Sequence, residues 1–195
     1  SLSKIILNGP ESELKLTQNT QPAIMTIGVS IFEVLKNNFN LNLNTTRFFA
    51  GHSLGEYTAL VCAGSLSLER AAYLLHQRGK SMQEAVPPGQ GSMMAVLGLR
   101  IDEVEKEINL LPKEEICEIA NDNTKGQVVV SGTKKAIKIL NENLKKKKKR
   151  GIILSVSAPF HCSLMKTAAE NMRKKIEDTN FLKPKPNVIS NVSAQ

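Results

Sequence analysis

The segment Gly51-His52-Ser53-Leu54-Gly55 matches G-x-S-x-G, a pattern in which the serine hydroxyl is a nucleophile. The segment Arg47-Phe48-Phe49-Ala50 before it predicts a short buried strand, and the residues after it, through Cys62, predict a helix. In this setting a sharp turn exposes the hydroxyl, and the N–H of Leu54 at the helix start is placed to stabilise an oxyanion. A glycine-rich turn with an incidental serine is the alternative, and the strand–turn–helix setting disfavours it.

A serine hydroxyl needs a general base to become a strong nucleophile, and the chain has three histidines. His52 is the variable position of the motif itself and is expected to point away from Ser53. His76 falls outside the apolar stripe of its predicted helix, so we expect it on a solvated face. His161 lies in a predicted loop before a helix, a common place for functional groups. Spacing alone makes His161 a candidate base and no more.

Arg78 lies on a helical face that is otherwise apolar. A helix is predicted over about 67–84, and Arg78 falls within its inward-pointing stripe. The apolar members of the stripe are Leu68, Ala71, Leu75 and Met82. A buried guanidinium needs a partner, and a carboxylate provides a bidentate, charge-assisted one. The alternatives are an internal Asp or Glu, or a side chain that extends to water.

Composition limits the class of protein. The chain has 195 residues, of which 41% are hydrophobic, 23% charged and 4% aromatic, which suits one or two globular domains and excludes general disorder. No apolar run approaches about 18 residues, so no transmembrane helix is predicted. Three cysteines without C-x-x-C spacing argue against disulfides and structural zinc, and favour a reducing compartment. The net charge of +8 favours an acidic partner, which could be nucleic acid, anionic lipid or an acidic protein.

The other predicted elements fall into two groups. A helix over about 21–38, capped by Thr20 and with Pro22 in its first turn, precedes the serine motif. Its predicted apolar stripe is Ile24, Ile27, Ile31 and Leu35. A second group follows, with strands at 93–99, 115–120, 127–130 and 152–156 and a turn at 121–126. Its predicted helices are one at 104–110 capped by Asp102 and one after strand 127–130 capped by Thr133. This β-α-β-β-α-β order is typical of a ferredoxin-like subdomain, here inserted into a larger α/β unit. A helix after His161 and a strand at 188–189 return to that unit.

Three blocks together resemble the malonyl-CoA:acyl-carrier-protein transacylase family, namely GHSLGEY at 51–57, QRGKSMQ at 77–83 and APFHCSLM at 158–165. Residues 121–129 and Asn191-Val192 are also similar to family segments, so the resemblance covers nearly the whole chain in order. It implies an α/β-hydrolase-like core formed by residues 1–91 and 158–195. The ferredoxin-like (βαββαβ) subdomain would be residues 92–157, with the active cleft between the two parts.

The resemblance also implies roles for individual residues. Ser53 would carry a malonyl group as an ester, His161 would be the general base, and Arg78 would hold the malonyl carboxylate. The ring of Phe160 would fill the space that an α-methyl group occupies. The implied reaction is ping-pong transfer from malonyl-CoA to acyl carrier protein in fatty acid biosynthesis, without a metal or redox cofactor. Further candidate substrate-binding residues are Met82, Asn121 and Asn123.

The sequence departs from the family pattern at both ends. Family members begin with a strand and a G-Q-G-S loop whose glutamine supplies the second oxyanion donor, and this chain starts after that point. Gly89-Gln90-Gly91-Ser92 has the same letters but occupies the place of a linker. The family carbonyl that orients the histidine falls beyond Gln195. The sequence therefore predicts a partial chain.

Two other functions remain open, an α/β-hydrolase-type esterase or thioesterase and a noncatalytic module that binds the carrier protein. The basic run Lys145–Arg150 is expected to be the solvated end of a helix, or a docking surface for acidic acyl carrier protein. Nucleic acid is disfavoured because aromatic residues are not interleaved with the basic ones. We expect a monomer without a membrane partner, in a bacterial cytoplasm or in an organelle with bacterial-type lipid synthesis. Fatty acid and polyketide pathways are not distinguished.

Overall fold

The structure is a computed structural model that describes residues 1–87, 89–156 and 158–195. The chain divides into two compact units, one of Ser1–Lys80 with Met172–Gln195 and the other of Ser81–Asn171. The divisions fall within two helices, α5 (Leu68–Glu84) and α8 (Lys166–Glu177). The second unit therefore begins before residue 92 and ends after residue 157, which are the predicted limits of the subdomain. Residue 157 itself lies outside the described residues. Within the described ranges, no helix is both long enough and apolar enough to cross a bilayer.

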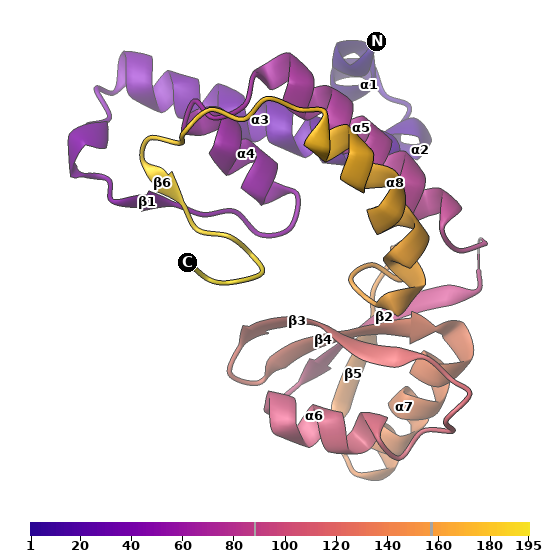
Figure 1. Ribbon diagram of the computed structural model, residues 1–195. Coiled ribbons are helices and arrows are strands. Elements are labelled where there is room, and N and C mark those ends of the chain that lie inside the picture. The colour runs from indigo at the N-terminus through magenta and orange to yellow at the C-terminus, as the bar shows by residue number, and fades with distance from the viewer. Residues whose placement is uncertain (88, 157) are drawn as a thin grey trace. The chain divides into compact units, whose positions relative to one another are not determined.

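The first unit is mainly helical (Figure 1). Its elements before α5 are α1 (Leu2–Asn8), α2 (Glu11–Leu14), α3 (Thr17–Asn38), the 3-10 helix η1 (Leu43–Thr45), β1 (Phe48–Phe49) and α4 (Gly55–Cys62). Strand β1 pairs in parallel with β6 (Asn187–Val188) from the end of the chain. Buried side chains of α3 and α5, among them Met25, Leu74 and Leu75, pack with Met172 of α8. This packing supports the serine turn, which joins β1 to α4.

Helix α3 differs from the helix that the sequence predicts. It begins four residues earlier, with Leu16 as its N-cap, and Pro22 lies inside it. Thr20 does not cap the helix, because its hydroxyl donates to the backbone oxygens of Leu14 and Leu16. The predicted apolar stripe is also exposed. Its members Ile24, Ile27, Ile31 and Leu35 are 41–56% exposed, whereas the neighbouring Ala23, Met25 and Val29 are buried.

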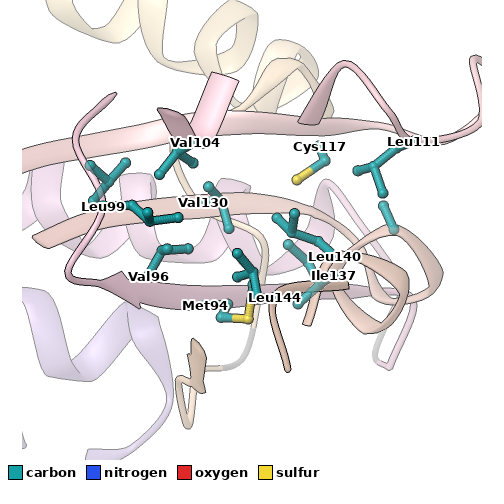
Figure 2. Close-up of a cluster of buried hydrophobic side chains, with 12 residues drawn as sticks. Met94, Val96, Leu99, Val104, Leu111, Cys117, Val130, Ile137, Leu140 and Leu144 are labelled. Atoms are coloured by element: carbon teal, nitrogen blue, oxygen red, sulfur yellow. The ribbon is translucent and has the colours of Figure 1, made fainter. Parts of the chain in front are cut away.

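The second unit contains a four-stranded antiparallel sheet in the order β3-β4-β2-β5. The chain order is β2 (Gly91–Leu97), α6 (Ile101–Ile108), β3 (Cys117–Thr124), β4 (Gln127–Thr133), α7 (Lys134–Lys146) and β5 (Arg150–Ile153). Helices α6 and α7 cover one face of the sheet, as Figure 1 shows. Met94, Val96 and Val130 point from the strands toward Ile137, Leu140 and Leu144 of α7 (Figure 2). The β-α-β-β-α-β order is the one that the sequence predicts.

Several boundaries in this unit differ from the predicted ones. Asp102 does not cap α6, whose N-cap is Arg100, and lies instead in the first helical turn. The predicted turn over residues 121–126 is mostly strand, because β3 continues to Thr124 and only Lys125 and Gly126 connect it to β4. Gly126 has φ +80°, which suits a tight turn. Thr133 caps α7 as predicted, with its hydroxyl accepting from the N–H of Ala136.

Candidate active site

Ser53 occupies a tight turn between β1 and α4. Its φ is +54°, which is uncommon for a residue with a side chain and typical of a nucleophile elbow. Gly51 is required in this turn, because a Cβ at this position would overlap the backbone of Gly55. Leu54 is the N-cap of α4, so its N–H points from the start of a helix, where a negative charge is stabilised. The turn therefore has the local geometry that the motif predicts.

Asn191 holds this turn from the far end of the chain. Its Oδ1 accepts from the N–H of Ser53 at 2.8 Å, and its Nδ2 donates to the backbone oxygen of Gly51 at 2.7 Å. Its own N–H donates to the Glu56 carboxylate at 3.1 Å. One asparagine thus ties both sides of the serine turn to the first turn of α4, and this fixes the backbone around the hydroxyl.

Arg78 of α5 lies beside the serine. Its Nη2 donates to Ser53 Oγ at 3.1 Å, and its Nη1 donates to Oε1 of Gln21, which is buried in α3. Both partners are neutral. Throughout the part of the chain that the structure describes, no carboxylate lies within ion-pairing distance of Arg78. The site thus presents a guanidinium, oriented by an amide, next to a serine hydroxyl.

The electrostatics around Arg78 follow from its surroundings. Burial lowers the pKa of the Arg78 guanidinium from its ordinary value, while nearby Tyr57 and Glu56 oppose that shift. Burial also raises the pKa of the Tyr57 hydroxyl, with Arg78 acting in the opposite direction. An arginine stays protonated under such conditions. A partly buried cation whose hydrogen-bond partners are neutral would be stabilised by an anionic ligand.

The second unit contains the candidate base. His161 lies in a turn after Pro159 and before the 3-10 helix η2 (Ser163–Met165), and its φ is +59°. The imidazole is exposed. Phe160 is half-buried and packs against the clusters of Met82 and Met93. Ser53 and Arg78 belong to the first unit, so the approach of His161 to them stays a prediction.

The other predicted site residues occupy different settings. Met82 is buried in an apolar cluster with Val86, Met165 and Ala168, and its contact with substrate stays a prediction. Asn121 is half-buried and Asn123 exposed, and both lie in β3, where the register with β4 shifts twice. Such bulges re-aim side chains and are frequent beside active sites.

The prediction that His76 lies on a solvated helix face is wrong. His76 is half-buried, and its Nδ1 lies 3.0 Å from the backbone oxygen of Gln18. The remaining histidine, His52, is exposed in the serine turn. In the described ranges, no group of three or more His, Cys, Asp or Glu side chains is arranged to hold a metal ion.

Sequence reasoning missed two residues of this site. Gln21 was recognised only as the start of a helix, and its contact with Arg78 spans 57 positions. Asn191 lies 138 positions from Ser53, and the sequence analysis noted it only as part of a similar segment. One feature of the sequence could have pointed to such a residue. Arg78 has no Asp or Glu at helical spacing, so a buried position would require a polar partner from another element.

The whole chain, residues 1–195, matches the family described as acyl transferase domain. The malonyl CoA-acyl carrier protein transacylase of Bacillus subtilis is 42% identical over 195 residues, which cover 99% of this chain and 60% of that protein. The protein of the same name from Staphylococcus aureus is 44% identical over 187 residues, which cover 95% of this chain and 59% of that protein. The chain thus spans about 60% of the length of these relatives.

Solved structures give the same result. The acyl-carrier-protein-S-malonyltransferase from Bartonella henselae has a TM-score of 0.93 and 43% identity, covering 100% of this chain and 62% of that one. A structure described as a type II PKS acyl-carrier protein in complex with its malonyl-transacylase has a TM-score of 0.93 and 37% identity, also covering 100% of this chain and 62% of that one. The mixed α/β fold described above is therefore the fold of these transferases.

Proposed function

Because the chain belongs to the acyl transferase domain family, we propose that it transfers a malonyl group from coenzyme A to the phosphopantetheine thiol of acyl carrier protein. The observation that carries this proposal is the pairing of Ser53 with Arg78, whose guanidinium has only neutral hydrogen-bond partners among the described residues. In a malonyl thioester, one methylene separates the carbonyl from the carboxylate. Such a group therefore suits a hydroxyl and a guanidinium that are themselves in contact.

In the first half-reaction, His161 takes the proton of Ser53 as Oγ attacks the thioester carbonyl. The carbonyl oxygen becomes an oxyanion, which the N–H of Leu54 stabilises. When the tetrahedral intermediate collapses, the carbon–sulfur bond breaks and the thiol of coenzyme A leaves with the proton from His161. Ser53 then carries the malonyl group as an ester, with its carboxylate paired to Arg78.

The second half-reaction reverses these roles. His161 takes the proton of the phosphopantetheine thiol, and the thiolate attacks the ester carbonyl. The carbon–oxygen bond breaks, and Ser53 regains its proton from His161. This chemistry exchanges an acyl group between nucleophiles without a change of oxidation state, so it needs no metal or redox cofactor. Phe160, Met82, Asn121 and Asn123 complete the proposed substrate site, Phe160 by excluding an α-methyl group.

The test is retention of label on the protein. After incubation with malonyl-CoA radiolabelled in the malonyl group, the wild-type chain should retain label on Ser53, and Ser53→Ala should retain none. Addition of acyl carrier protein should remove the label from the wild type and transfer it to the carrier. If the wild type retains no label, including when the segments of its longer relatives are joined to it, the proposal is wrong. Rapid release of free malonate without carrier would instead identify a thioesterase.

The proposal includes a finer description of the fold. We assign residues 1–91 and 158–195 to an α/β-hydrolase-like core, which the parallel pairing of β1 with β6 supports. Residues 92–157 form the ferredoxin-like subdomain, supported by the antiparallel order β3-β4-β2-β5. The enzyme would act as a monomer in a bacterial cytoplasm, or in an organelle with bacterial-type lipid synthesis.

For the carrier protein, we assign docking to the basic run Lys145–Arg150. All six side chains are exposed at the end of α7 and the start of β5, and Lys147 pairs with Glu107 at 2.6 Å. Replacing Lys145, Lys146, Lys148 and Lys149 by Gln should raise the KM for acyl carrier protein several-fold at low salt and leave the KM for malonyl-CoA unchanged. A KM for acyl carrier protein that stays at the wild-type value would contradict this assignment.

A further inference from the structure

The turn that carries His161 has an unfavourable backbone conformation. His161 has φ +59°, in the left-handed region that side chains other than glycine rarely occupy. Such a conformation persists where the surrounding structure holds the residues on both sides of it. Before His161, Pro159 is buried and packs so closely on β2 that a Cβ at Gly91 would overlap its ring.

Two neighbouring side chains of the sheet hold the residues after His161. The Glu118 carboxylate of β3 accepts from the N–H of Ser163 at 2.8 Å and also from the Ser163 hydroxyl. Ser131 of β4 lies directly opposite Glu118 in the strand register, and its hydroxyl is 3.6 Å from the Sγ of Cys162. Residues opposite each other on paired strands share a face of the sheet. Glu118 and Ser131 therefore bind the two residues that follow His161.

We propose that Glu118 is a positioning residue that fixes the direction of the His161 imidazole by clamping Ser163. This inference rests on the proposed role of His161 as the general base. Two hydrogen bonds from one residue to a carboxylate are charge-assisted and set both the position and the orientation of that residue. Since Ser163 is only two residues from His161, its release would let the turn relax away from the left-handed conformation.

The kinetic test compares Glu118 with a second carboxylate of the same sheet region. Glu118→Ala should lower kcat for malonyl transfer about tenfold, with the KM for malonyl-CoA unchanged, and Glu118→Gln should recover part of the loss because one acceptor oxygen remains. Glu115→Ala is the matched control. Glu115 accepts from the Thr133 hydroxyl and pairs with Lys135 at 2.6 Å. Glu115→Ala therefore removes a comparable number of polar contacts, none of which involves Ser163. Equal kcat losses in Glu115→Ala and Glu118→Ala would overturn the inference.

A spectroscopic test does not depend on activity. The chain has only three histidines, so the ring signal of His161 in ¹H–¹³C NMR spectra can be assigned by replacing His52 and His76 one at a time with Gln. Glu118→Ala should shift or broaden the His161 signal and leave the other two in place. An unmoved His161 signal would overturn the inference, whether or not the chain transfers malonyl groups. Absence of malonyl transfer in the wild type would overturn the proposed function instead.

Discussion

The Ser53 turn and the four-stranded sheet are stabilised in different ways. The sheet is built from regular strands whose alternating side chains fill the core beneath α6 and α7. The Ser53 turn lies between a very short strand pair and the start of α4, since β1 and β6 have two residues each and α4 begins at Gly55. Polar side chains from distant segments hold it in place. Regular packing thus fixes one region and a few specific hydrogen bonds fix the other, so single substitutions should affect them differently.

The largest expected effect concerns Arg78, which donates to Ser53 Oγ and is the proposed partner of the malonyl carboxylate. Arg78→Ala should lower malonyl transfer about thousandfold, because the proposed pair of guanidinium and malonyl carboxylate loses one partner. This corresponds to about 4 kcal/mol in the transition-state free energy. Transfer of an acetyl group, which has no carboxylate, should fall far less. The comparison is made by kcat/KM with malonyl-CoA and acetyl-CoA, and equal losses would show that Arg78 does not bind the carboxylate.

A large effect on the sheet region should come from the core. Leu140 is fully buried in α7, and Leu140→Ala should lower the free energy of unfolding of the second unit by about 3 kcal/mol because it leaves a cavity. Lys138→Ala on the exposed side of the same helix is the control and should change it by less than about 0.5 kcal/mol. Amide hydrogen exchange in β2 and β4 measures the loss. Equal effects at both positions would contradict the core packing described above.

The serine turn should respond most to a change of its backbone. Gly51→Ala should destabilise the first unit by about 2 kcal/mol or more and reduce labelling of Ser53, because the added Cβ overlaps the backbone of Gly55. Gly55→Ala is the control, since a Cβ built there meets no atom within 4 Å apart from its chain neighbours and the backbone of its own helix. Urea unfolding measures both variants. A Gly51→Ala protein as stable as Gly55→Ala would show that the turn is not held as tightly as its geometry indicates.

The smallest expected effect concerns the side chain that holds the turn. Asn191→Ala should cost about 1 kcal/mol of stability, because water replaces the lost partners of Ser53 and Gly51 at this exposed site. The rate at which Ser53 is labelled should also fall clearly, although the loss of stability is small, because the backbone around the hydroxyl becomes less ordered. Asn37→Ala removes an exposed side-chain hydrogen bond to Glu33 and is the control. If the labelling rate stays at the wild-type value in Asn191→Ala, the hydrogen bonds of Asn191 do not order the serine.

The two regions also differ in how well the sequence predicted them. The order of strands and helices in the second unit followed from apolar periodicity, and the Thr133 cap followed from a residue type at a helix start. Helix α3 was predicted less well. Its isoleucines have helical spacing, yet Ile24 and Ile31 are exposed and Met25 is buried. Two overlapping stripes on one helix are equally periodic, so periodicity could not decide which of them faces the core.

By itself, the sequence determined that Ser53 lies between a strand and a helix and that Arg78 continues an apolar helical face. It also determined the β-α-β-β-α-β order of the second unit. These features depend on residues that are close together along the chain, so the spacing of residue types within each segment predicts them. Only the tertiary structure decided that Gln21 orients Arg78, that Asn191 holds the serine turn and that Glu118 clamps Ser163. The partners in these contacts are 57, 138 and 45 positions apart. A single polar contact at such separation leaves no repeating pattern in the sequence, because folding alone brings the two partners together.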